Sequence, residues 1–236
     1  MYKYTIIIPV FNEEKIIISK ITSYISKLKK LGVNFMIIVS ENGSTDNTKL
    51  LLKKLKNMYK KNFKYLTTYK PNYGLALKKG ILASKGDFII CEELDICDIS
   101  FFKKVKKLLE NDTYDVIVGS KNHRSSKDLR PTSRKITSKI LMLILRYFLN
   151  FKGTDTHGLK AFNNKIKKII LKTKLDKDMF ATELVIRASN SYLRYFEVPI
   201  ILKEIRSTPI ALYKRILKAS SQILKLIVLR CYGKLN

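Results

Sequence analysis

The run of apolar, mostly β-branched residues from Tyr4 to Val10 constrains the fold more than any other feature of the sequence. An uninterrupted run of this kind is typical of a strand in a parallel sheet that is covered on both faces. Isoleucines at helical spacing follow as far as Lys30, and they predict an α-helix directly after the strand. A strand that leads into a helix is the first half of a βαβ unit.

Strands and helices continue to alternate as far as Gly119. Further strands are predicted over residues 34–40, 65–69, 87–91 and 114–118, and helices over 47–59, 73–84 and 99–110. This alternation predicts an α/β fold with a Rossmann-like, mostly parallel sheet flanked by helices. Ligands of such folds bind at the carboxyl ends of the strands, so we expect the loops at 11–14, 41–46 and 92–98 to share one edge.

The pattern changes after Gly119. Residues 120–135 are polar and basic, which predicts a mobile loop. Helices are then expected over 136–149, 179–191 and 209–230, and a strand over 194–202. We therefore divide the chain into an α/β half at 1–120, which carries the three ligand-binding loops, a second half of the same domain at 121–205, and an amphipathic C-terminal helix at 206–236.

The formal net charge of +28 indicates attraction to polyanions such as nucleic acid, anionic lipid or nucleotide phosphates. A compositional bias toward Lys, which is spread along the whole chain, explains the charge equally well. The sequence has no nucleic-acid recognition motif or aromatic stacking platform, so we expect no nucleic-acid partner. A basic, non-catalytic binding protein is the least favoured interpretation.

The three cysteines show no paired or metal-ligand spacing, so they are expected to be reduced thiols. The apolar segment at the N-terminus is too short for a signal peptide, and no run reaches the ~18 apolar residues of a membrane span. We therefore expect the protein to reside in the cytosol.

Two polar clusters follow the first two predicted strands. The first contains Asn12 and Glu14, and helix capping explains it as well as function does. In the second, Glu41 can accept hydrogen bonds from a base or ribose, Gly43 permits a tight turn, and Asp46 can cap the next helix. An ordinary capped turn is the alternative.

A third cluster ends the strand at 87–91. Glu93 and Asp95 lie two residues apart, so their side chains are expected to point the same way and to hold one divalent cation against a diphosphate. The cation would neutralise charge that develops on a departing nucleotide. A solvated acidic loop is an equally good interpretation of this cluster taken alone.

Together the clusters are much more specific. The segments Ile-Pro-Val-Phe-Asn-Glu-Glu, Glu-Asn-Gly-Ser-Thr-Asp, Asn-Tyr-Gly-Leu-Ala and Glu-Leu-Asp, in this order, resemble family 2 glycosyltransferases of the GT-A fold. Within that family the chain looks most like dolichyl- or polyprenyl-phosphate sugar synthases. The matches that indicate this are Arg134 with Ser138, Asp155-Thr156, residues 158–162, Glu183 and Glu197-Val198-Pro199.

The resemblance implies a role for each matching residue. The expected nucleotide-sugar contacts are Pro9, Asn12, Glu14, Glu41, Asn42, Gly74, Lys78 and Glu93. Glu93 and Asp95 would hold Mg²⁺ or Mn²⁺. The expected acceptor-phosphate contacts are Arg124, Arg130, Arg134, Ser138 and Arg206. Asp95, Arg134 and Asp155 are the expected catalytic residues.

The implied function is transfer of one sugar, with inversion, from a UDP- or GDP-sugar to a polyprenyl or dolichyl phosphate. A glycan or other non-lipid acceptor is the alternative. An ionised phosphate acceptor needs no strong general base, so His123 and His157 are expected to be loop or packing residues.

The sequence departs from the family pattern in two places. The family usually has two aspartates where this chain has Glu41-Asn42, and Asp-x-Asp where it has Glu93-Leu94-Asp95. Glutamate can still ligate a hard cation, so we expect altered affinity more than lost activity. The chain has no Trp, so it lacks the Gln-x-x-Arg-Trp motif of processive polysaccharide synthases, and polymerisation is not expected.

Two amphipathic helices carry the prediction of membrane contact. The helix at 136–149 is apolar nearly all round, and the last helix places apolar residues on one face and Lys and Arg elsewhere. Both are expected to lie on the cytosolic membrane surface. Packing on the domain, on a second copy of the chain or on a membrane-protein partner is the alternative.

Overall fold

A computed structural model describes residues 2–202 and 212–235, so Arg206 and Pro209 lie outside the described residues. Within them, the main sheet has the order β3-β2-β1-β4-β7-β5-β8. Its strands are β1 (Tyr4–Val10), β2 (Phe35–Glu41), β3 (Phe63–Thr67), β4 (Phe88–Cys91), β5 (Val116–Ser120), β7 (Lys160–Asn163) and β8 (Tyr195–Pro199). A small second sheet pairs β6 (Lys127–Asp128) with β9 (Ile201–Leu202).

The neighbouring strands β3, β2, β1 and β4 all run parallel, as the alternation of strands and helices predicts. β7 is inserted antiparallel between β4 and β5, where Phe162 pairs with Ile89 on one side and with Val116 on the other. The sheet therefore combines strands from both halves of the chain. The division at residue 120 itself stays a prediction.

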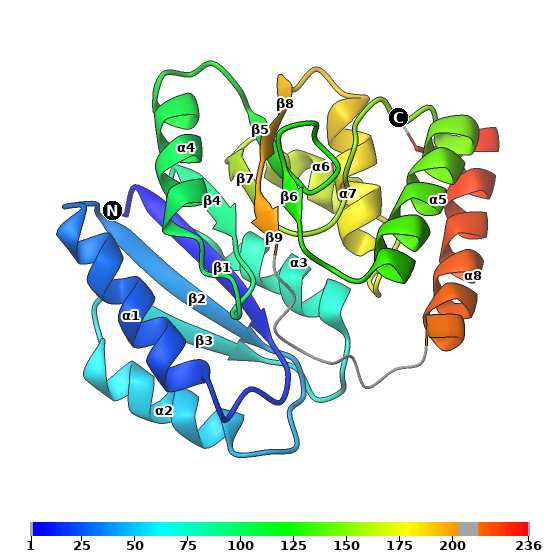
Figure 1. The fold of residues 1–236 in the computed structure, drawn as a ribbon. Helices are drawn as coiled ribbons and strands as arrows, with labels where there is room; N and C mark the ends of the chain where they lie inside the picture. The colour runs from blue at the N-terminus through cyan, green and yellow to red at the C-terminus, as the bar shows by residue number, and fades with distance from the viewer. Residues whose placement is uncertain (1, 203–211, 236) are drawn as a thin grey trace.

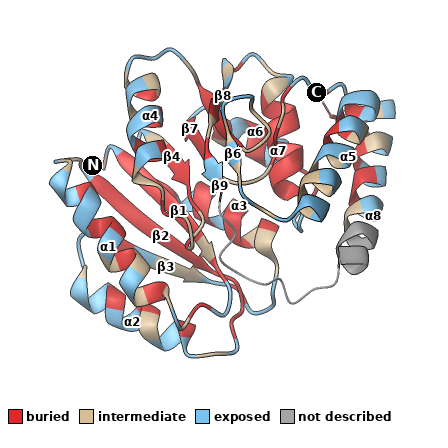
Figure 2. Cartoon of the chain, viewed as in Figure 1, coloured by how far each residue is buried: buried red, intermediate tan, exposed pale blue. Residues whose placement is uncertain are grey.

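Helices cover both faces of the sheet, which gives three layers (Figure 1). The helices are α1 (Ile17–Lys30), α2 (Thr48–Met58), α3 (Tyr73–Ala83), α4 (Ile99–Glu110), α5 (Thr132–Leu149), α6 (Ile166–Lys172), α7 (Phe180–Ser189) and α8 (Leu212–Cys231). One core cluster joins the sheet to α1, α2 and α4, and a second joins it to α3, α6 and α7, with α5 and α8 side by side at its outer end. Figure 2 shows the sheet as the most buried layer.

Several predicted boundaries are wrong. α1 begins at Ile17, separated from the end of β1 at Val10 by residues 11–16, instead of directly after the strand. The third strand spans residues 63–67 instead of 65–69. The predicted loop at 120–135 contains β6, and α5 begins at Thr132, directly after Pro131, because polar residues suit the first turn of a helix.

Candidate active site

The loops after β1 and β2 are bonded to each other at the carboxyl edge of the sheet. The Asn12 backbone N–H donates to Ser44 Oγ at 3.0 Å, and Asn12 Oδ1 accepts from the Thr45 N–H at 2.8 Å. Glu14 Oε2 accepts from the backbone N–H of Asn47 at 3.0 Å and from its side-chain amide at 2.9 Å. Glu14 thereby satisfies an N–H group at the start of α2, where a negative charge is favoured.

Glu41 ends β2 and is fully buried. Its Oε1 accepts a hydrogen bond from the Ser44 N–H, whereas Oε2 is buried without a hydrogen-bond partner among the residues that the structure describes. Gly43 has φ +73°, and a Cβ there would lie 2.9 Å from the Lys70 carbonyl carbon, so glycine is required for this turn. An unsatisfied buried carboxylate oxygen at a ligand-binding edge fits a hydrogen-bond donor on a bound nucleotide.

The neighbouring predicted contacts lie close to Glu41 or on α3. Asn42 is buried and its Oδ1 accepts from the Asn72 N–H at the start of α3. A Cβ on Gly74 would come within 2.0 Å of the Lys177 carbonyl oxygen, and Lys78 Nζ donates to Thr173 Oγ1 at 3.0 Å. Gly74 and Lys78 thus contact the segments around α6 and α7. Their predicted nucleotide contacts stay predictions, as does that of Pro9, which lies in β1 next to its end.

The loop after β4 presents two carboxylates at the same edge. Glu93 and Asp95 are both half-buried, whereas the intervening Leu94 and the preceding Glu92 are buried. No group of three or more His, Cys, Asp or Glu side chains able to hold a metal is found in residues 2–202 and 212–235. Two carboxylates still fit Mg²⁺ or Mn²⁺, because such cations are commonly held by one or two carboxylates together with substrate phosphates.

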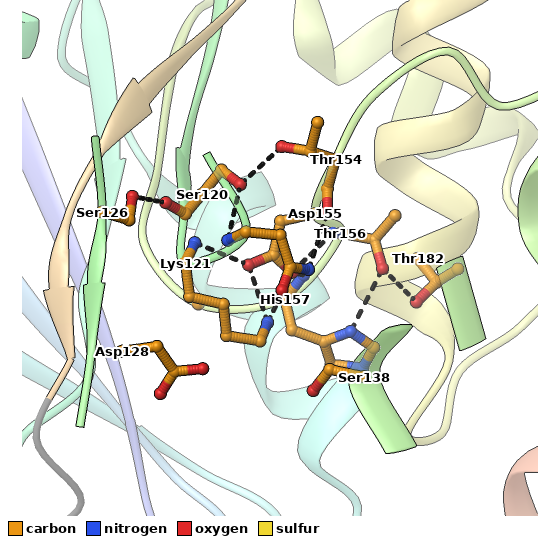
Figure 3. Close-up of polar contacts among 12 residues, drawn as sticks. Ser120, Lys121, Ser126, Asp128, Ser138, Thr154, Asp155, Thr156, His157 and Thr182 are labelled. Atoms are coloured by element: carbon orange, nitrogen blue, oxygen red, sulfur yellow. Dashed lines mark hydrogen bonds and ion pairs between the residues drawn. The ribbon is translucent and has the colours of Figure 1, made fainter. Parts of the chain in front are cut away.

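Lys121, which directly follows β5, and Asp155, in the loop that precedes β7, form a buried ion pair (Figure 3). Lys121 Nζ lies 2.6 and 2.7 Å from the two carboxylate oxygens of Asp155. The backbone N–H groups of Lys121, Thr156 and His157 also donate to this carboxylate, at 3.1, 2.8 and 3.0 Å. Burial alone would raise the pKa of Asp155, but the Lys121 charge and these hydrogen bonds hold it below its usual value.

Asp155 therefore accepts five hydrogen bonds on two oxygens. A carboxylate in this state organises its own loop and orients Lys121, and it has little basicity left for a substrate. The geometry favours a positioning role, while the catalytic role expected for Asp155 stays a prediction.

His157 is neutral in this setting. Burial and the positive charge of Lys121 lower its pKa to about 3. Its Nδ1 lies 3.1 Å from Thr156 Oγ1, which lies 3.0 Å from Thr182 Oγ1 (Figure 3). A general base works best with a pKa near the operating pH, so His157 is poorly suited to that role.

Two further carboxylates that match the family have structural partners. Glu197 Oε1 accepts from the Thr154 N–H at 2.7 Å and so fixes the start of the Asp155 loop. The buried Glu183 pairs with Arg187 at 2.8 Å and accepts from the Leu175 N–H at 2.7 Å. Both glutamates hold the loops that flank the site.

The predicted acceptor-phosphate residues are only partly brought together. Arg130 is paired through Nε and Nη2 with both oxygens of Asp128, at 2.9 and 2.8 Å, and its Nη2 also lies 3.2 Å from Ser138 Oγ. Arg134 lies half-buried on α5, and Arg124 is exposed in the preceding loop. Their predicted contact with a phosphate stays a prediction.

A cavity of about 450 Å³ opens between α5 and the loops of the Lys121–Asp155 pair. It combines four cationic side chains with apolar ones and with polar groups. The lining residues are Lys121, Asn122, Asp128, Lys135, Lys139, Met142, Leu143, Arg146 and Thr154. Such a lining suits a ligand that carries both a negative charge and an apolar portion.

Comparison with known proteins places this site in a family. The model of glycosyl transferase family 2 matches residues 5–173. The chain belongs to glycosyl transferase family 2. Its GT-A fold, predicted from the sequence, is confirmed by a solved glucosyl-3-phosphoglycerate synthase from Mycobacterium tuberculosis, in complex with Mn²⁺, UDP-glucose and phosphoglyceric acid. That structure matches with a TM-score of 0.68 and 18% identity over 99% of this chain and 80% of its own.

Curated relatives of this family 2 member include three sugar transferases. Glycosyltransferase AglD of Haloferax volcanii is 24% identical over 94% of this chain and 36% of its own length. Dolichyl-phosphate beta-glucosyltransferase of Saccharomyces cerevisiae is 28% identical over 88% of this chain and 69% of its own. Undecaprenyl-phosphate 4-deoxy-4-formamido-L-arabinose transferase of Proteus mirabilis is 24% identical over 59% and 43%. The chain thus spans little more than a third of the archaeal relative.

Most residues that line the cavity of this family 2 member were not predicted as site residues from the sequence. Lys121 carries a signal that was available, because it directly follows a buried strand, in the way that Glu41 ends one. Lys135, Lys139 and Arg146 recur at helical spacing along α5. The pairing of Lys121 with Asp155, 34 residues away, depends on the tertiary fold and leaves no local signal.

Proposed function

We propose that this family 2 glycosyltransferase moves one sugar from a UDP- or GDP-sugar to a polyprenyl or dolichyl phosphate, with inversion, on the cytosolic face of a membrane. The observation that carries the proposal is the cavity beside α5, in which Lys121, Lys139 and Arg146 share one space with Met142 and Leu143. Cations suit a phosphate head, and apolar side chains suit the first units of its lipid tail.

The donor is proposed to bind at the edge formed by the loops after β1, β2 and β4. Glu41 Oε2 would accept a hydrogen bond from the nucleotide, and Glu93 and Asp95 would hold Mg²⁺ or Mn²⁺. When bound, the cation neutralises charge on the departing diphosphate. The solved structural neighbour, which contains Mn²⁺ and UDP-glucose, supports this arrangement.

The reaction is proposed to be a single displacement. An oxygen of the acceptor phosphate attacks the anomeric carbon while the bond from that carbon to the diphosphate breaks, and the nucleoside diphosphate leaves. The acceptor is already ionised at neutral pH, so alignment and charge neutralisation provide most of the catalysis. The low pKa of His157 and the saturated carboxylate of Asp155 agree with a site that needs no strong base.

Membrane contact is proposed for the outer face of α5. Ile136, Ile140, Leu143 and Tyr147 follow one another at helical spacing, and each is more than half exposed. No helix in the described part of the chain is long and apolar enough to cross a membrane. The yeast and Proteus relatives, named for dolichyl and undecaprenyl phosphate, support a lipid acceptor.

A small anionic acceptor is the second candidate. The solved structural neighbour contains phosphoglyceric acid, and the lysines of the cavity would attract such an acid as well as a lipid phosphate. The apolar side chains Met142 and Leu143 favour the lipid.

Radiolabelled UDP- and GDP-sugars, incubated with the protein, Mn²⁺ and short polyprenyl phosphates, test the proposal. We expect label in the organic phase, and we expect Lys139→Gln to lower its rate by roughly tenfold because a charged hydrogen-bond partner is lost. Lys103→Gln, an exposed lysine on α4, is the matched control. Label that appears only on water-soluble products would contradict the lipid acceptor.

A further inference from the structure

Helix α1 packs against the back of the loop that carries Glu93 and Asp95. Lys20 Nζ donates to the backbone carbonyl of Asp95 at 2.6 Å. Tyr24 lies one helical turn further along the same face of α1, and its hydroxyl donates to Glu92 Oε1 at 3.1 Å. Two side chains of one rigid helix thus hold the loop at two points.

Glu92 extends this link to the far end of the loop. It is fully buried, and its second oxygen, Oε2, accepts from the backbone N–H of Asp98 at 3.2 Å. Tyr24 is also buried, so the hydrogen bond between the two side chains is shielded from water. Leaving either group without its partner would be costly in such surroundings.

Between these points the loop turns tightly. The Glu93 carbonyl accepts from the N–H groups of Ile96 at 3.0 Å and Cys97 at 2.9 Å. Cys97 has φ +43°, in the left-handed region that a non-glycine residue adopts only when its surroundings impose it. The conformation of the loop that carries Glu93 and Asp95 therefore depends on contacts outside the loop.

We infer that Lys20 and Tyr24 are positioning residues that hold the loop in the shape in which Glu93 and Asp95 can share one divalent cation. The inference rests on the proposed function, since it takes these two carboxylates as the cation ligands. Mg²⁺ and Mn²⁺ sites tolerate little displacement of their ligands, and removing a partner that orients a ligand typically weakens metal affinity by roughly 10–100-fold.

The space around Lys20 makes the inference testable by substitution. A cavity of about 260 Å³ lies against Lys20 and Tyr24 and is also lined by Ser19, Ser23, Lys27, Ile96 and Cys97. A loop released from Lys20 therefore has room to shift. Lys27 lines the same cavity two turns further along α1, and it serves as the matched control.

Titration of the full chain with Mn²⁺ alone, followed by electron paramagnetic resonance of the free ion, measures affinity without reference to turnover. We expect Lys20→Met and Tyr24→Phe each to weaken Mn²⁺ binding by roughly 10–100-fold, while Lys27→Met and Lys20→Arg bind nearly as the parent does. At saturating Mn²⁺ the kcat of Lys20→Met is expected to recover, because the ligands themselves remain. Thermal unfolding of each variant separates a loss of fold from a loss of loop geometry.

Asp95→Asn, in the same titration, separates the two hypotheses. If Asp95→Asn loses Mn²⁺ binding while Lys20→Met and Tyr24→Phe retain parental affinity, the positioning role is wrong and the cation site stands. If Asp95→Asn binds Mn²⁺ as tightly as the parent, the proposed cation site is wrong and the positioning role falls with it.

Discussion

Glu41 has two carboxylate oxygens that differ in their surroundings. Its Oε1 shapes the loop by accepting from the Ser44 N–H, and its Oε2 lacks a hydrogen-bond partner among residues 2–202 and 212–235. The family usually has an aspartate here, and glutamate, which is one methylene longer, still leaves one carboxylate oxygen without a hydrogen-bond partner among the described residues. The departure from the family pattern is therefore compatible with nucleotide binding.

Glu41→Gln is expected to weaken binding of UDP or GDP by roughly 10–100-fold, since hydrogen bonds to charged groups contribute about 1.5–3 kcal/mol. Isothermal titration calorimetry with each nucleotide and Mn²⁺ measures the change. Glu110→Gln is the control, because Glu110 pairs with Lys106 on α4 and lies at the other end of the sheet from Glu41. Parental affinity in Glu41→Gln would rule out Glu41 as a nucleotide contact.

At the scale of elements, the regular βα units were predictable and the inserted pieces were not. β1, β2 and β4 are continuous apolar or nearly apolar runs, and the helices that follow them have clear periodicity. The parallel pairing of these strands confirms that the three loops share one edge. β7 has polar residues at both ends, Lys160 and Asn163, and its place between β4 and β5 depends on partners far away in the sequence. The Lys121–Asp155 pair follows from that insertion, so it could not be predicted from the local sequence either.

Helix α5 was predicted as an apolar helix, and the structure divides its surface in two. Met142, Leu145 and Leu149 are buried against the domain, whereas the stripe of Ile136, Ile140, Leu143 and Tyr147 is exposed. The exposed stripe lies next to the cavity, which shares Leu143 with it. The tail of a lipid held in the cavity would extend out of the protein at the face that carries this stripe.

Ile140→Glu is expected to lower binding to vesicles that contain anionic lipid by roughly tenfold or more, because burial of an isoleucine side chain contributes about 1.5–3 kcal/mol. Co-sedimentation with the vesicles measures the bound fraction. Leu171→Glu introduces the same charge at an exposed leucine of α6 and should leave binding unchanged. Equal loss in both variants would point to general electrostatics instead of the α5 stripe.

At the scale of the whole molecule, the net positive charge and the buried His157 both make the stability of the fold depend on pH. The net charge of +28 attracts anionic surfaces and repels itself within the compact state, and both effects are sensitive to pH and salt. His157 adds a local cost on acidification, because its pKa in the folded protein lies near 3, below the ordinary value of 6.5. As the pH falls, His157 therefore takes up a proton in the unfolded chain before it does so in the folded protein.

The free energy of unfolding should consequently be highest above pH 6.5 and fall as the pH drops from there toward 3, by up to about 1.4 kcal/mol per pH unit from His157. Urea unfolding at pH 7.5 and at pH ~5.5, where carboxylates are still ionised, measures the fall. His157→Gln should reduce the fall, whereas His123→Gln should not. An equal fall in both variants would show that other groups dominate.

The insertion of β7 also bears on how the protein is made. Until residues 160–163 leave the ribosome, the edges of β4 and β5 that later pair with β7 have no neighbour, although everything needed for the β3-β2-β1-β4 layer has already been translated. The nascent chain must keep those edges apart from other strands while about forty residues between β5 and β7 are added. Insertion of β7 and arrival of Asp155 beside Lys121 then belong to the same stage, whereas β8 is added to the free edge of β5 only after further residues have been translated.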